Sequence, residues 1–101
     1  MKRKTIDKKR IRKDCWDLDF AFIKWLNIRL KIYKKEASKF VDLTYHKFNY
    51  NDKELTQIEI IDKLIKLTNE LISMDMWDLD YHNKTNEMLD LWKLVFPAMW
   101  W

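Results

Sequence analysis

Arg29 is the residue whose type and neighbours favour ligand chemistry most clearly. It lies in a strongly helical stretch, with Trp25 one turn before it and Tyr33 one turn after it. An arginine at this spacing can stack on an aromatic ring and present its planar fork of N–H donors to a phosphate or a carboxylate. The structural alternative is an ion pair with an acid of another helix, such as Asp62 or Asp90. The sequence leaves both alternatives open.

Lysines and aromatic residues extend this pattern into a predicted ligand-binding set. Lys24 and Lys34 can widen a face that attracts anions, although a surface lysine is more often simply solvated. Aromatic side chains, including those of the stretch "TYHKFNY", can stack on a nucleotide base. The predicted ligand-binding residues are Arg29, Lys24, Trp25, Tyr33, Lys34, Tyr45 and His46.

Residues suited to catalysis or metal binding are few. The chain has two histidines, two serines and one cysteine, and none of them forms a local pair of nucleophile and base. Metal sites need more ligands in closer spacing. Glycine is absent, which excludes the glycine-rich loops that cradle phosphates. We therefore expect no enzyme activity, no cofactor and no metal site.

The net charge of +4 is unevenly distributed along the chain. Residues 1–13 carry eight basic side chains and one acidic side chain, whereas residues 51–101 carry five basic and ten acidic ones. The basic excess therefore lies in one terminal segment, which either attracts phosphate polyanions or stays solvated. A single cysteine, Cys15, excludes an internal disulfide and fits a reducing cytosol.

The absence of glycine and the single proline, Pro97, predict long helices with short polar connections and argue against a hairpin-rich fold. Apolar spacing predicts a helix from Asp17 or Asp19 to about residue 39 and another over 56–74, opened by a Thr56–Glu59 capping box. A third should begin between residues 80 and 85 and end at Pro97. The stretch 40–52 reads as an irregular connection or a short helix.

The predicted fold is all-α: a compact, oligomeric bundle of three to four helices, with a basic tail over 1–13 and a single helical domain over 14–101. The first helix has an apolar arc so wide that it needs neighbours on more than one side, which favours a central helix or an oligomer interface. The charges within this helix exclude a membrane span. The predicted interface residues are the aromatics of the last segment, Trp92, Phe96, Trp100 and Trp101.

A seven-residue phrase occurs twice. "DCWDLDF" begins at Asp14 and "DMWDLDY" begins at Asp75. Both precede predicted helices, and aspartate is a favoured N-cap, so the preferred interpretation is two helix starts built from the same residues. A cation site formed by the six aspartates is the less favoured alternative.

Three segments resemble small uncharacterised proteins of tailed bacteriophages. In the first, "WDLDFAFIKWLNIRLKIYK", the residues that match the family pattern are Trp16, Leu18, Asp19, Lys24, Trp25, Arg29, Leu30, Tyr33 and Lys34. The others are "IIDKLI" and the terminal "EMLDLWKLVFPAMWW". The connection after the first helix is longer here than in that family, and Ile28 stands where the family usually has proline. The resemblance implies a phage protein that acts in the cytoplasm of the host cell.

Small size, helical character and sparse catalytic residues favour a binding function. The first hypothesis is a counter-defence protein that sequesters an anionic nucleotide signal in a homo-oligomer, with Arg29 and Lys24 on the phosphates. A second is an inhibitor that binds a host defence protein or complex through exposed aromatics and the acidic C-terminal half. A third is nucleic-acid binding through residues 2–13.

Overall fold

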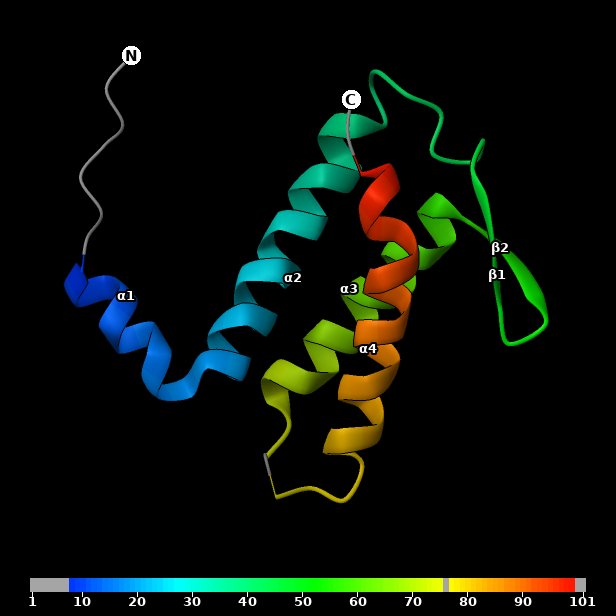
Figure 1. Ribbon diagram of the computed structural model, residues 1–101. Helices are drawn as coiled ribbons and strands as arrows, with labels where there is room; N and C mark the ends of the chain where they lie inside the picture. The colour runs from blue at the N-terminus through cyan, green and yellow to red at the C-terminus, as the bar shows by residue number, and fades with distance from the viewer. Residues whose placement is uncertain (1–7, 76, 100–101) are drawn as a thin grey trace, which may run out of the picture.

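The computed structural model describes residues 8–75 and 77–99, and most of them are helical. The helices are α1 (Lys8–Asp14), α2 (Leu18–Ala37), α3 (Gln57–Ser73) and α4 (Tyr81–Val95), with short 3-10 helices η1 (Cys15–Asp17) and η2 (Phe96–Ala98). Two strands, β1 (Lys47–Tyr50) and β2 (Lys53–Thr56), complete the described part. Figure 1 shows α2, α3 and α4 packed as a bundle, with α1 standing out from it. The predicted mainly helical fold is confirmed.

Helix α3 is the centre of the bundle, because it packs against both α2 and α4. The predicted capping box is confirmed: the Glu59 N–H donates to Thr56 Oγ1 at 3.3 Å, and the Thr56 N–H donates to Glu59 Oε1 at 2.9 Å. The hydrogen bond from the Thr56 N–H to the carboxylate, followed by that from the Thr56 side chain, lowers the pKa of Glu59. The apolar side chains buried around α3 are Ile23, Leu26, Leu30, Ala37, Leu43, Leu55, Ile60, Ile61, Leu64, Leu67, Leu71, Met88, Leu91 and Val95.

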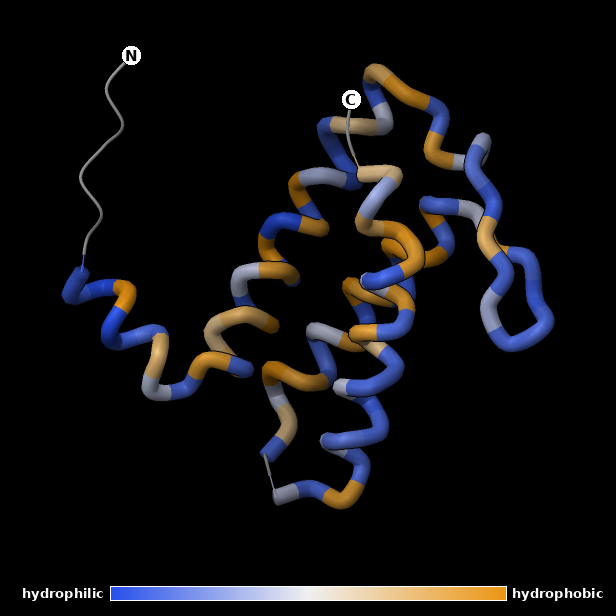
Figure 2. Tube along the Cα trace, viewed as in Figure 1, coloured by the Kyte–Doolittle hydropathy of each residue, from blue (hydrophilic) through white to orange (hydrophobic). Residues whose placement is uncertain are grey.

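Helix α2 lies at the side of the bundle and packs on α3 along one face. Its opposite face leaves Trp25, Ile28 and Ile32 about half exposed. The wide apolar arc of this helix favoured either a central position in the bundle or an oligomer interface. The central position is wrong, because α3 occupies it. Figure 2 shows many apolar residues along α2, α3 and α4, whereas α1 is mostly hydrophilic.

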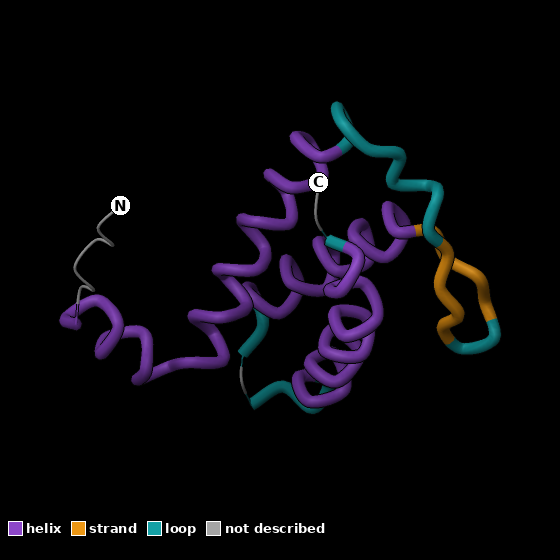
Figure 3. Tube along the Cα trace, turned by 45° about the horizontal axis from the view of Figure 1, so that its top comes forward, coloured by secondary structure: helices purple, strands orange, loops and turns teal. Residues whose placement is uncertain are grey.

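The connection after α2 contains a β-hairpin, although the stretch 40–52 was expected to be an irregular connection or a short helix. Strands β1 and β2 pair antiparallel, with Tyr50 opposite Lys53, and they project beside the bundle (Figure 3). Asn51 and Asp52 form the two-residue turn with φ values of 49° and 63°. Asparagine and aspartate tolerate the left-handed region better than other residues with a Cβ, so the hairpin forms without glycine. The fold is therefore not purely α-helical.

The helix boundaries near both ends of the chain differ slightly from the predicted ones. Helix α1 begins at Lys8, inside the segment predicted as a tail, whereas residues 1–7 lie outside the described part. At the other end, α4 stops at Val95 and Pro97 lies within η2. Trp92 packs against the core and its ring contacts that of Phe96, with centroids 4.9 Å apart. Trp100 and Trp101, also predicted as interface residues, lie outside the described residues.

The two "WDLD" phrases do not cap helices with their side chains. Asp17 and Asp80 occupy the N-cap positions of α2 and α4, and in the described structure neither carboxylate accepts an N–H of its helix. The phrases also differ in conformation, because the first runs through η1 into α2 and the second forms a loop before α4. Both phrases do lie at helix starts, as predicted, but the capping hydrogen bonds expected of their aspartates are absent at these two N-cap positions.

Candidate ligand-binding site

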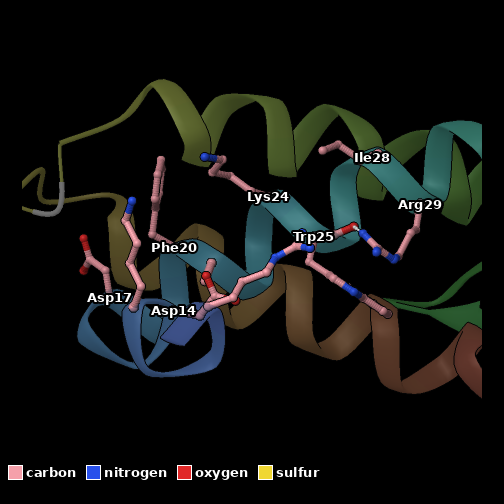
Figure 4. Close-up of a pocket in the computed structure, with 10 residues that line it drawn as sticks. Asp14, Asp17, Phe20, Lys24, Trp25, Ile28 and Arg29 are labelled. Carbon is pink, nitrogen blue, oxygen red and sulfur yellow. Dashed lines mark hydrogen bonds between the residues drawn. The ribbon is translucent and has the colours of Figure 1, made fainter. Parts of the chain in front are cut away.

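A hollow of about 510 Å³ lies in the angle between α1 and α2, which we call the elbow (Figure 4). The connecting η1 turns the chain so that the basic helix α1 faces the first half of α2. The volume falls in the range of small-molecule sites. The residues lining the elbow are Arg10, Lys13, Asp14, Asp17, Phe20, Ala21, Lys24, Trp25, Ile28 and Arg29.

Arg29 lies over the ring of Trp25, with its guanidinium carbon 4.4 Å from the ring centroid. Its Nη1 also donates to the Trp25 carbonyl oxygen at 3.3 Å. These contacts fix the direction of the side chain while using one of the five N–H groups of the guanidinium. The remaining donors can receive a phosphate or a carboxylate.

The predicted structural alternative for Arg29 involved an ion pair with Asp62 or Asp90. Among the described residues, Asp62 pairs instead with Lys34, at 2.6 Å between Nζ and Oδ1. Arg29 is exposed and takes part in none of the ion pairs within 8–75 and 77–99. The ion pair with Asp62 or Asp90 that was the structural alternative for Arg29 is therefore not found among the described residues.

Lys24 repeats the arrangement of Arg29 on the same wall of the elbow. Its ammonium lies 5.2 Å from the centroid of Phe20, four residues earlier, as Trp25 is four residues before Arg29. Residues four apart are neighbours on a helix surface, which explains both pairs. A cation held over an aromatic ring keeps its charge and gains apolar surface beside it. The wall thus presents two cations and two aromatic rings.

Helix α1 and η1 supply the other wall of the elbow. Arg10 and Lys13 bring the basic side chains to four, while Asp14 and Asp17 add two carboxylates. The excess of positive charge attracts phosphate, and the carboxylates can accept hydrogen bonds from sugar hydroxyls or base amino groups. The combination suits a ligand with both a phosphate and a polar ring system.

Two other predicted ligand-binding residues of α2 lie outside the elbow. The Tyr33 hydroxyl accepts a hydrogen bond from Gln57 Nε2 at 3.3 Å, and burial raises the pKa of this tyrosine. Lys34 forms the ion pair with Asp62 that joins α2 to α3. Both side chains contribute to packing between elements, so the structure gives them a role within the fold.

Tyr45 and His46 lie in the connection after α2, at the end opposite to the elbow. Their rings meet edge to face, with centroids 5.3 Å apart. They line a separate hollow of about 240 Å³ together with Val41, Asp42, Gln57 and Ala98. The predicted set therefore divides into an elbow group, consisting of Lys24, Trp25 and Arg29, and residues elsewhere.

Sequence reasoning missed Phe20, Asp14 and Asp17 as residues of the candidate site. Phe20 could have been identified from its position four residues before Lys24, because residues at this spacing are neighbours on a helix surface. Nothing in the sequence pattern indicated the angle between α1 and α2, which brings the two aspartates to the hollow. In the described residues, no group of three potential metal ligands occurs. None of the described helices is long and apolar enough to cross a membrane.

Comparison with known proteins finds no matching family model, no similar curated protein and no similar solved structure. The resemblance to tailed-phage proteins consequently stays a prediction from the sequence.

Proposed function

We propose that this chain binds an anionic nucleotide in the elbow and that, as a phage protein in the host cytoplasm, it sequesters a defence signal. The observation that carries the proposal is that four basic side chains line one hollow together with an exposed tryptophan: Arg10 and Lys13 from α1, and Lys24 and Arg29 from α2. Such a site needs no glycine-rich loop, because side chains rather than backbone amides provide the donors.

The α2 wall of the elbow carries side chains suited both to the phosphates and to the base of a nucleotide. Arg29 and Lys24 meet the phosphates, with the α1 cations closing the opposite side. The rings of Trp25 and Phe20 offer apolar surface to the base, since base–aromatic stacking contributes roughly 1–3 kcal/mol. Trp25 is 47% exposed, which leaves part of its ring for such a contact.

One chain contains every residue of this site. Nucleotide binding therefore does not require the homo-oligomer of the first hypothesis. We propose the homo-oligomer separately. The exposed face of α2 at Ile28 and Ile32, together with Phe96, supplies apolar surface for assembly.

A thermal-shift screen tests the binding function. The panel contains cyclic di- and trinucleotides, ADP-ribose, inorganic phosphate and a short single-stranded oligonucleotide. A ligand at about 100 times its dissociation constant adds roughly 2.7 kcal/mol, which is on the order of ten degrees in a domain of this size.

The expected result is a shift for one free nucleotide that disappears in Arg29→Ala. The matched control is Arg12→Ala, an exposed arginine of α1 that does not line the elbow. A rise in melting temperature with the oligonucleotide alone would indicate that the protein binds nucleic acid instead. A flat response to the whole panel would contradict both and favour a protein target.

A further inference from the structure

Helix α2 carries an apolar stripe with the spacing of a coiled coil. Leu18, Trp25 and Ile32 are seven residues apart, and Ala21 and Ile28 follow the first two by three residues. These are the a and d positions of a heptad, which lie along one line of a helix. Leu18, Ala21 and Trp25 border one common hollow, and Ala21, Trp25 and Ile28 border the elbow. We call these five residues the seam.

The four large side chains of the seam are about half exposed. The exposed fractions are 62% for Leu18, 47% for Trp25, 52% for Ile28 and 57% for Ile32. The buried residues of α2 lie about half a turn away, where this helix packs on α3, and they are Ile23, Leu26, Asn27, Leu30 and Ala37. Figure 1 shows α3 and α4 on the same side of α2. An apolar stripe left open on the other side indicates a face that docks a helix.

Basic side chains flank the seam along most of its length. Four exposed ones belong to α2, namely Lys24, Arg29, Lys31 and Lys35. None of the four takes part in an ion pair within the described part of the chain. Carboxylates lie near the two ends of the seam, where Asp14 borders the hollow beside Leu18 and Glu36 pairs with Lys39 at 3.2 Å. The middle of the seam therefore has a positive potential.

The helix contacts inside the bundle show which neighbour suits such a face. Between α2 and α3, Lys34 pairs with Asp62 at 2.6 Å, and between α4 and α3, Lys84 pairs with Glu70. In both contacts the outer helix gives the lysine and α3 gives the acid, beside buried apolar side chains. The seam repeats the apolar side chains and the lysines. A helix whose apolar stripe is flanked by carboxylates would complete the same arrangement.

We propose that the seam docks an amphipathic helix of a partner protein, with aspartates or glutamates beside its apolar stripe. A second copy of this chain fits less well, because it would bring its own basic flanks against those of the first. The proposed homo-oligomer would compete for this face, and the flanking charges favour the acidic helix. Trp25 and Ile28 also line the elbow, so a docked helix would exclude a bound nucleotide. Docking itself does not depend on nucleotide binding.

A synthetic helix of about 21 residues, or three heptads, is the probe for this contact. It has leucine at the a and d positions and glutamate at e and g, where like charges keep it from pairing with itself. The control peptide has lysine at e and g. Fluorescence anisotropy of each labelled peptide, titrated with the full chain, should show saturable binding of the glutamate peptide at least about tenfold tighter than that of the lysine peptide. No binding of the glutamate peptide, or equal binding of both, would overturn the proposal.

Leu18→Ala/Ile32→Ala tests where the peptide docks. Both residues belong to the seam and neither lines the elbow, so docking should weaken at least about tenfold while any nucleotide-dependent rise in melting temperature persists. The two proposals can therefore fail separately. Leu79→Ala/Leu89→Ala is the matched control, because these leucines are 95% and 45% exposed outside α2, and it should leave docking unchanged.

Two results with the seam variant would contradict the proposal. Peptide binding that survives Leu18→Ala/Ile32→Ala would show that the acidic helix docks elsewhere. Sedimentation equilibrium without peptide gives the other result. A chain that dimerises alone and becomes monomeric in the same variant would assign the seam to a second copy and overturn the choice of partner.

Discussion

The phenol of Tyr81 donates a hydrogen bond to the carboxylate of Asp19 and so joins the start of α4 to the start of α2. The bond lowers the pKa of Asp19, and burial together with this carboxylate raises the pKa of Tyr81 to about 12. The contact therefore stays in its hydrogen-bonded form from neutral to alkaline pH.

Tyr81→Phe should lower the free energy of unfolding by about 1 kcal/mol at neutral pH, the usual net value of such a bond. Because the pKa of Asp19 is lower in the folded state than in the unfolded state, the contribution is present above about pH 4 and is lost as the pH falls through the folded pKa. Urea titrations of the unsubstituted chain and of Tyr81→Phe at neutral and acidic pH measure this difference in the free energy of unfolding. Tyr45→Phe, at an exposed ring, is the control and should have no effect.

Asn27→Ala should destabilise the packing of α2 on α3 by about 1–2 kcal/mol. The buried Asn27 amide donates to Thr68 Oγ1 at 2.8 Å and to Asn69 Oδ1 at 2.9 Å. The loss stays moderate because the Thr68 hydroxyl still donates to the Leu64 carbonyl oxygen at 2.7 Å. Asn86→Ala, on the exposed face of α4, is the matched control. Equal denaturation midpoints for both variants would refute a structural role for Asn27.

Asp52→Gly should stabilise the hairpin, and with it the protein, by about 0.5 kcal/mol. The left-handed conformation costs a residue with a Cβ about 1 kcal/mol, and glycine avoids this cost. Part of the stabilisation is offset, because glycine has more conformational entropy to lose on folding. Asn49→Gly, in the middle of β1, should instead lower stability. Thermal unfolding of the two variants measures the difference. A lower melting temperature for Asp52→Gly would show that the turn does not have the left-handed geometry.

The helices could be predicted from the sequence because their signals are local. The Thr56–Glu59 capping box and the isoleucine–leucine periodicity that follows it place α3 within one residue of its observed limits. The hairpin could not be predicted in the same way. Its turn residues, Asn51 and Asp52, are turn-forming types, but the absence of glycine argues against strand pairing.

The site was only partly predictable for a related reason. The spacing of Trp25 and Arg29 identifies one wall of the elbow, because both residues lie on a single helix. The position of Arg10 depends on the angle between α1 and α2, which no local pattern encodes. Tyr33 shares the same helix but faces Gln57, since eight residues of helix carry it away from the direction of Trp25.

The indole N–H signal of Trp25 in nuclear magnetic resonance spectra offers the most direct test of the proposed site. The isotope-labelled chain would be titrated in turn with cyclic di-AMP, a cyclic trinucleotide and ADP-ribose, with Trp25→Phe identifying the signal. We expect that one of these ligands moves the Trp25 signal, leaves that of Trp77 in place, and loses its effect in Arg29→Ala. A Trp25 signal that stays unmoved by all three ligands would contradict nucleotide binding at the elbow.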